Sequence, residues 1–181
     1  MYVLGQKRLI EMNGSKALIV SYSYSGHTYQ IARAVQTLTG ADWCELHPWQ
    51  PYPVEFPALL QQVRQEVKAG YRPRLLPGAL SPEDYAVVFA GSPNWCGTIA
   101  PPLTSWLAGK DWSGKVVFPF YSYCGGAVGN IRADIAALCP GAEVRKALGI
   151  LQVGQTNLLQ EIQSWLETAG IPLQMVAALL F

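Results

Sequence analysis

The chain has 181 residues, of which 50% are hydrophobic and 14% are charged, and its formal net charge is +1. A chain of this length can form one domain with a substantial core, and this composition excludes an intrinsically disordered protein. Because it carries neither a strong basic excess nor a long basic run, nucleic acid is not expected as a main partner.

Targeting and metal-binding signals are also missing from the sequence. No signal-peptide pattern follows Lys7 and Arg8, and the apolar run 175–181 is too short to span a bilayer. The cysteines, Cys44, Cys96, Cys124 and Cys139, form no CxxC pair, and with two histidines they offer no set of metal ligands. We therefore expect a reduced, cytoplasmic protein with no membrane span and no metal site.

The first predicted strand covers residues 16–22 and ends in a loop of small hydroxyl residues that opens directly into a helical pattern at 28–39. The N–H groups of a first helical turn lack intrahelical acceptors, and the helix dipole favours negative charge. The loop therefore predicts an anion site. Since residues 21–28 contain no lysine or arginine, it suits a phosphate that is bound without being transferred. The alternative interpretation is an ordinary helix cap beside a tight turn.

Strands and helices then alternate. Further strands are predicted at 42–46, 85–90, 115–120 and 143–148, and further helices at 56–69, 101–108, 127–138 and 156–168. Continuous apolar strands indicate burial on both faces of a parallel sheet, and right-handed crossovers then predict a doubly wound, three-layer α/β sandwich with a five-stranded parallel sheet.

The ends of the chain lie outside this pattern. Residues 1–14 form an N-terminal extension, residues 15–170 the domain, and residues 171–181 an apolar C-terminal tail that either adds an edge strand or packs against a partner chain. At the start of the last helix, Asn157 and Gln160 are spaced as a capping box.

Ligands of doubly wound sheets bind beyond the carboxyl ends of the strands. Three predicted loops lie there, at 23–28, 91–98 and 121–126, and each is rich in small residues. The second carries Trp95 and the third carries Tyr123, which are interpreted either as core residues or as ligand contacts. One phosphate cradle and two aromatic loops predict a site for a phosphorylated, flat, conjugated ligand.

The sequence S-x-S-G-H-T at 23–28 resembles the phosphate loop of flavodoxins, T/S-x-T-G-N-T. Other segments match one subgroup of flavodoxin-like proteins. They are Pro51-Tyr52-Pro53, Arg72-Pro73, Asp84-Tyr85, Gly-Ser-Pro-x-Trp at 91–95 with prolines after it, and Ser-Gly-Lys at 113–115. The resemblance covers residues 15–168, and it implies a short-chain, flavodoxin-like FMN-binding protein with strand order 2-1-3-4-5.

The resemblance also implies where FMN binds. The phosphate loop would be Ser23, Tyr24, Ser25, Gly26, His27 and Thr28, with His27 at the family's asparagine position. Trp95 would lie against one face of the flavin ring, and Tyr123 could cover the other. The remaining contacts would be Ser92, Pro93, Asn94, Cys96, Gly97, Ser122, Cys124, Gly125 and Gly126.

For function, the resemblance implies electron transfer, with the flavin cycling through a semiquinone. A cradle without cations leaves the phosphate charge in place, which disfavours an anionic reduced flavin. In flavodoxins a peptide after the stacking aromatic rotates during reduction. Here it would be Cys96–Gly97, turning from type I to type II, since a glycine accepts positive φ at the third turn position.

Two other functions stay open. Typical flavodoxins are strongly acidic and dock basic partners, whereas this chain has a sequence pI of about 7.6. An FMN-dependent NAD(P)H:quinone-type oxidoreductase is therefore one alternative, and a non-redox binding module on the same scaffold is the other. The expected partners are redox proteins or a nicotinamide nucleotide, with room for a homodimer. Cys96 and Cys124 are either plain small apolar residues or form a thiol or disulfide coupled to the flavin.

Overall fold

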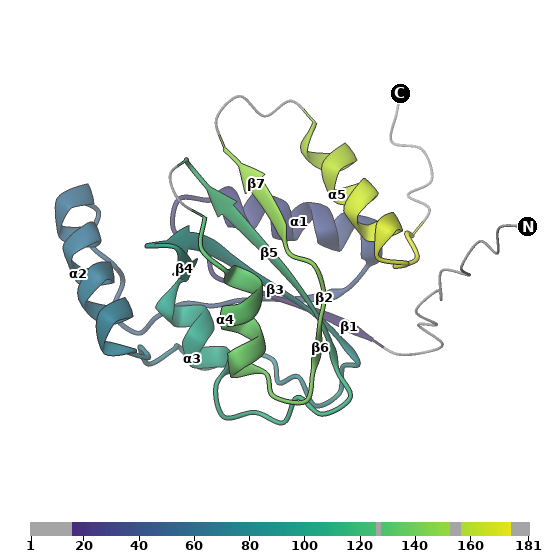
Figure 1. Ribbon diagram of the computed structural model, residues 1–181, viewed down its shortest axis with the longest axis horizontal. Coiled ribbons are helices and arrows are strands. Elements are labelled where there is room, and N and C mark those ends of the chain that lie inside the picture. The colour runs from purple at the N-terminus through teal and green to yellow at the C-terminus, as the bar shows by residue number, and fades with distance from the viewer. Residues whose placement is uncertain (1–15, 126–127, 153–156, 175–181) are drawn as a thin grey trace, which may run out of the picture.

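The structure is a computed structural model that describes residues 16–125, 128–152 and 157–174 (Figure 1). The predicted alternation of strands and helices is present. The elements in chain order are β1 (Ala17–Ser21), α1 (His27–Thr39), β2 (Asp42–Glu45), α2 (Phe56–Ala69), β3 (Val87–Trp95), β4 (Thr98–Ile99), α3 (Pro101–Leu107), β5 (Val116–Tyr123), α4 (Ile131–Leu138), β6 (Glu143–Val144), β7 (Leu148–Leu151) and α5 (Leu158–Thr168).

The sheet has the order β2-β1-β3-β5-β6, with β7 also paired to β5, and all of these pairs are parallel. This confirms the predicted doubly wound topology. The predicted fifth strand at 143–148 is divided, because β6 pairs with the start of β5 and β7 with its end. Between them the chain leaves the ladder, and the Lys146 carbonyl accepts a hydrogen bond from Trp165 Nε1 at 3.1 Å.

The two central strands are longer than predicted. Parallel pairing of β3 with β5 continues to Ser92↔Tyr121 and Pro93↔Ser122. The first residues of two predicted loops therefore lie at strand ends, where ladder hydrogen bonds hold their backbone. β3 then turns back into β4, which pairs with it antiparallel. That hairpin was not predicted.

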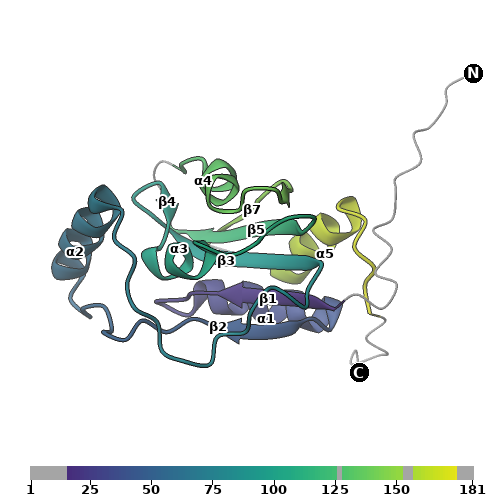
Figure 2. The same cartoon turned by 90° about the horizontal axis from the view of Figure 1, so that it is seen from below.

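Burial on both faces of the strands is confirmed. In β1, Ala17 and Ile19 pack with α1 and α5, whereas Leu18 and Val20 pack on the other face with α3 and α4. All four are at most 4% exposed. Alternate side chains of a strand point to opposite faces, so a continuous apolar strand builds two cores. Figure 2 shows α4 and α1 separated by the strands.

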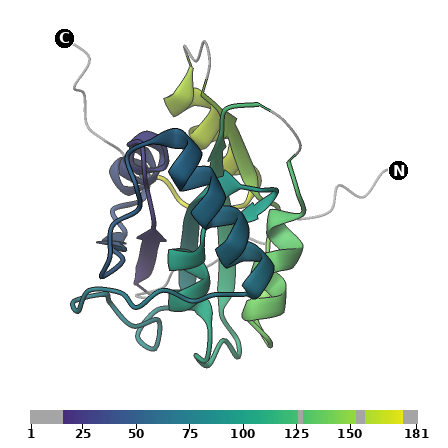
Figure 3. The same ribbon diagram turned by 90° about the vertical axis from the view of Figure 1, so that its left-hand side faces the viewer.

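Helix α2 departs from the simplest three-layer arrangement. It lies beyond the carboxyl ends of the strands in Figure 1, and it crosses in front of the sheet in Figure 3, which views the molecule from that side. Leu59 and Val63 are its buried residues. The helix therefore covers the edge of the sheet where ligands bind in doubly wound folds.

The capping box predicted at the start of α5 is wrong. Asn157 is the N-cap, but its side chain makes no capping hydrogen bond, because its backbone (φ −130, ψ 35) is not in the extended conformation of capping residues. Residues 171–174 of the predicted tail form no strand. Ile171 is buried, and the Gln174 N–H donates to the Leu38 carbonyl at 2.8 Å. The rest of the tail and the N-terminal extension lie outside the described residues.

Candidate functional site

The first loop ends at Gly26, which has φ 86 and is the N-cap of α1. This left-handed conformation suits glycine, and it starts the helix one residue earlier than predicted. The Ser23 hydroxyl accepts a hydrogen bond from the Tyr29 N–H at 3.1 Å, and the Ser25 hydroxyl lies 2.8 Å from His27 Nδ1. The hydroxyls of Ser23 and Ser25 thus lie beside the first turn of α1, whose N–H groups have no intrahelical acceptors.

A buried hydrogen bond joins the first loop to the third. Thr28 Oγ1 lies 2.8 Å from Ser122 Oγ, and both residues are buried. Ser122 is in β5 and Thr28 is in α1, so this bond sets the distance between the helix terminus and the end of the strand. A buried hydroxyl pair of this kind keeps each polar group satisfied.

Trp95, at the end of β3, is half-buried among three tyrosines. Its ring centroid lies 5.5 Å from Tyr22, 5.8 Å from Tyr24 and 5.0 Å from Tyr52, and all three contacts are edge-on. The Tyr24 hydroxyl in turn donates to the Pro53 carbonyl at 2.6 Å. Edge-on aromatic pairs of this geometry are favourable, so the tyrosines fix the orientation of the indole.

The turn after Trp95 differs from the predicted one. β3 and β4 pair at Trp95↔Thr98, which leaves a two-residue loop in which Cys96 has φ 53 and Gly97 has φ 82. Positive φ at both positions is a type I′ turn, whose twist matches that of the paired strands. The predicted starting point, a type I turn, is therefore wrong. Rotating the central peptide of a type I′ turn would produce type II′, which favours glycine at the position that Cys96 occupies.

The Cys96–Gly97 turn is in close contact with the segment around Gly129. A Cβ atom added at Gly129 would lie 1.5 Å from the Gly97 carbonyl oxygen, so only glycine fits at position 129. On the other side of the hairpin, the Thr98 hydroxyl donates to Asp134 of α4 at 2.7 Å. These contacts hold the hairpin against the fourth helix.

The three loops share one pocket of about 360 Å³, which we call the loop pocket. Predicted residues from all three loops line it: Ser25, Pro93, Asn94, Trp95, Cys96, Ser122, Tyr123, Cys124 and Gly125. The other lining residues were not predicted from the sequence: Phe56, Leu59, Leu60, Val63 and Gln152. The apolar spacing of α2 was visible, but a doubly wound fold would place that helix on a face of the sheet.

Other predicted residues lie near the pocket without lining it. Tyr24 contacts Trp95, and Ser23, Gly26, His27 and Thr28 surround the start of α1. The Ser92 hydroxyl is fully buried, donates to the Pro93 carbonyl and accepts from the Ala100 N–H, so it stabilises the hairpin. Gly97 lies in the turn. Gly126 lies outside the described residues.

The three loops carry few ionisable groups. Residues 22–28, 91–98 and 121–125 contain no Asp, Glu, Lys or Arg. Burial is the main cause that raises the pKa of Tyr22 and of Tyr52 well above the usual tyrosine value, so both phenols beside Trp95 stay neutral. Cys96 and Cys124 line the pocket as exposed, free thiols.

Comparisons with known proteins identify the family and the fold. A family model described as flavodoxin matches residues 16–169. The chain belongs to the flavodoxin family. No curated protein shows significant sequence similarity to it. In the described part of this flavodoxin-family chain, none of the helices has the length and hydrophobicity needed to cross a membrane.

Solved structures show the same fold. A Bacteroides eggerthii protein, provisionally assigned as a flavoprotein, superposes with a TM-score of 0.74 at 23% identity, covering 87% of this chain and 99% of its own. A flavoprotein from Lactobacillus acidophilus in complex with FMN superposes with a TM-score of 0.65 at 18% identity, covering 75% of this chain and 93% of its own. An oxidised flavodoxin 2 from Bacillus cereus superposes with a TM-score of 0.52 at 18% identity, covering 86% of this chain and 97% of its own.

Proposed function

We propose that this protein binds FMN in the loop pocket and passes electrons singly between redox partners. The observation that carries the proposal is that three loops, separated in the sequence, line one pocket of about 360 Å³ next to the start of α1. That volume falls within the range usual for small-molecule sites. The flavodoxin-family match and the FMN complex of the Lactobacillus relative favour the same ligand.

The first turn of α1 fits the phosphate. Its N–H groups and the hydroxyls of Ser23, Ser25 and Thr28 are donors for phosphate oxygens. With Ser122 as the donor in its bond to Thr28, the Thr28 hydroxyl proton would be available to a phosphate oxygen. Since the loop has no lysine or arginine, the bound phosphate would keep its negative charge beside the flavin.

Trp95 fits the flavin ring. It lines the pocket, and T-shaped contacts with three tyrosines hold its ring. Phe56, Leu59 and Leu60 of α2 would keep water from the opposite side of the pocket. When bound, FMN supplies reversible electron transfer, and these residues hold the ring in an apolar, uncharged environment.

Replacing Trp95 tests the proposal. Titrating the apoprotein with FMN should quench flavin fluorescence at one equivalent, and Trp95→Ala should weaken binding by about fivefold or more because base-sized rings lose about 1–3 kcal/mol without an aromatic partner. Trp49→Ala is the matched control, since Trp49 is 53% exposed and does not line the loop pocket. Equal FMN affinity in the two variants would refute the assignment of Trp95.

A specific observation favours a second function, that of an FMN-dependent NAD(P)H:quinone-type oxidoreductase. The pocket has an apolar wall from α2, and its loops carry no acidic residues that would steer a basic protein partner. Such a wall suits a flat, apolar acceptor. Steady-state oxidation of NAD(P)H with a quinone by the FMN-loaded protein would favour the oxidoreductase, and its absence would favour the carrier.

A further inference from the structure

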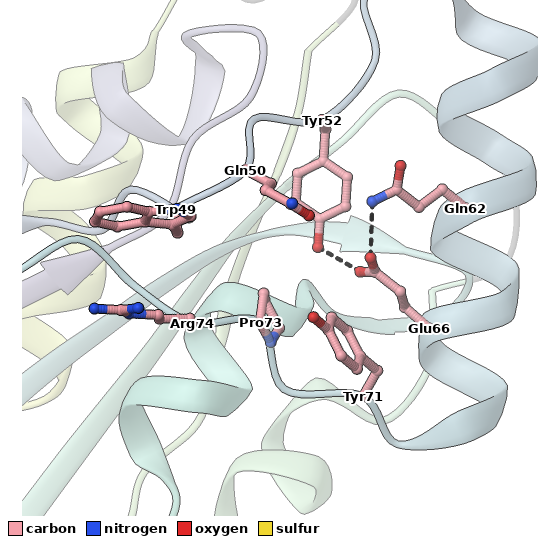
Figure 4. A pocket seen from close by; sticks show the side chains of 8 residues that line it. All are labelled: Trp49, Gln50, Tyr52, Gln62, Glu66, Tyr71, Pro73 and Arg74. Atoms are coloured by element: carbon pink, nitrogen blue, oxygen red, sulfur yellow. Dashed lines mark hydrogen bonds between the residues drawn. The ribbon is translucent and has the colours of Figure 1, made fainter.

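A second pocket, of about 230 Å³, lies between α2 and the segments on either side of it; we call it the α2 pocket. Figure 4 shows Tyr52 and Gln62 turned toward Glu66, with Trp49 and Arg74 lying against each other farther away. Those that matter here are Trp49, Tyr52, Gln62, Glu66, Tyr71 and Arg74. Two segments that resemble the flavodoxin-like subgroup, Pro51-Tyr52-Pro53 and Arg72-Pro73, contribute to this pocket, whereas neither lines the loop pocket.

Glu66 is a fixed hydrogen-bond acceptor in this pocket. Tyr52 donates to one carboxylate oxygen at 2.5 Å, and Gln62 donates to the other at 2.8 Å (Figure 4). A carboxylate has about four acceptor sites, so each oxygen can accept one more bond. Among the described residues, no lysine or arginine lies within ion-pair distance of Glu66. It therefore suits a ligand that brings its own N–H donors.

The rest of the pocket supplies flat surfaces and a positive charge. Trp49 and Tyr71 are 53% and 51% exposed. The Arg74 guanidinium lies 4.5 Å from the centre of the Trp49 ring, which orients it. Stacked guanidinium groups keep their N–H edges for phosphate. Residues 56–74 hold four basic side chains, including Arg74, and one acidic one, Glu66.

A flat ring with N–H donors and an attached phosphate matches all three features, and this is the chemistry of a purine nucleotide. The pocket is smaller than sites that enclose a whole drug-sized ligand, so it holds one part of a larger molecule. Tyr52 lines it, and the Tyr52 ring is 5.0 Å from Trp95, which lines the loop pocket. The two pockets therefore lie on either side of the Tyr52–Trp95 contact.

We propose that the α2 pocket binds the adenosine-phosphate half of a nicotinamide dinucleotide that reduces the FMN. This inference rests on the proposed FMN site and identifies its electron donor. The dinucleotide transfers a hydride, two electrons with one proton, to the flavin, which takes a second proton from water. Oxidised dinucleotide and two-electron-reduced FMN are the products. Glu66 would accept the purine N–H groups, and Arg74 would bind the phosphate.

The test uses 2′,5′-ADP, which has the adenosine and phosphates but no nicotinamide, so it binds without redox chemistry. It is titrated by calorimetry into the full-length protein. Binding should be saturable, and Glu66→Gln and Arg74→Gln should each weaken it at least tenfold. The matched control is Arg64→Gln, because Arg64 is an exposed α2 arginine outside the pocket. It should stay within twofold.

Three outcomes would overturn the proposal. These are no binding of 2′,5′-ADP, unchanged affinity in Arg74→Gln, or equally effective competition by inorganic phosphate, which would mean a general anion site. Arg74 is exposed, so its variant should fold even if Glu66→Gln does not. An FMN titration of the same samples separates the two proposals. Binding of 2′,5′-ADP without binding of FMN would support the α2 pocket and refute the FMN site.

Discussion

Cys96 is a non-glycine residue with positive φ, at 53°, in a type I′ turn. The sequence Trp-Cys-Gly-Thr predicts a turn, because glycine permits positive φ, but it does not identify the turn type. The type follows from pairing of Thr98 with Trp95, which depends on how the chain enters α3. The residues of the turn were therefore predictable, and their conformation was not.

The positive φ of Cys96 lowers the free energy of unfolding, and a substitution can remove this strain. Asn-Gly is the preferred sequence for a type I′ turn, and left-handed backbone costs an ordinary residue about 1 kcal/mol or more. Cys96→Asn should raise the free energy of unfolding by about 0.5–1 kcal/mol, measured by urea denaturation of the apoprotein. Cys96→Ala keeps the strain and is the control. A destabilised Cys96→Asn would contradict the type I′ assignment.

At the scale of elements, α2 shows that apolar periodicity predicts the bounds of a helix but not its place in the fold. Its bounds were predicted as 56–69 and are observed as Phe56–Ala69. Apolar spacing identifies the face of a helix that is buried, not the part of the fold that buries it. The long irregular segments before and after α2 let it lie beyond the strand ends, so its contribution to the loop pocket was missed.

Two substitutions in α2 should separate stability from binding. Leu59 is 6% exposed and Phe56 is 69% exposed, yet both line the loop pocket. Leu59→Ala should lower the free energy of unfolding by about 2–4 kcal/mol, as for other buried leucines. Phe56→Ala should change it by less than about 0.5 kcal/mol while weakening FMN binding. Thermal unfolding and FMN titration measure the two effects. Normal FMN affinity in Phe56→Ala would mean that this part of α2 does not contribute to the FMN site.

At the scale of the whole molecule, the parallel sheet was predictable because apolar strands alternated with helical patterns and β-α-β crossovers have one hand, whereas its strand order was implied by the resemblance to flavodoxins. The three loops then had to meet at one edge of the sheet. The division of the last strand and the β3–β4 hairpin were not predictable, since each depends on pairing between segments as short as two residues.

Buried tyrosines and thiols should also make stability depend on pH. The pKa values of Tyr22 and Tyr52 are raised above the usual 10.0, and burial raises the pKa of Cys139 to about 12 from 9.0. These groups remain protonated when folded, while the unfolded chain releases their protons. Stability should therefore be insensitive to them below about pH 8 and fall as the pH rises above that. Denaturant unfolding from pH 8 to 11 tests this, and Tyr52→Phe should lessen the decline; an equally steep decline would contradict it.

The most direct test of the FMN site is a crystal structure of the protein grown with FMN. We predict the phosphate at the first turn of α1, within hydrogen-bond distance of the Thr28 hydroxyl, and the flavin ring in the loop pocket against Trp95. A flavin bound elsewhere, or a loop pocket that stays empty at saturating FMN, would contradict the account.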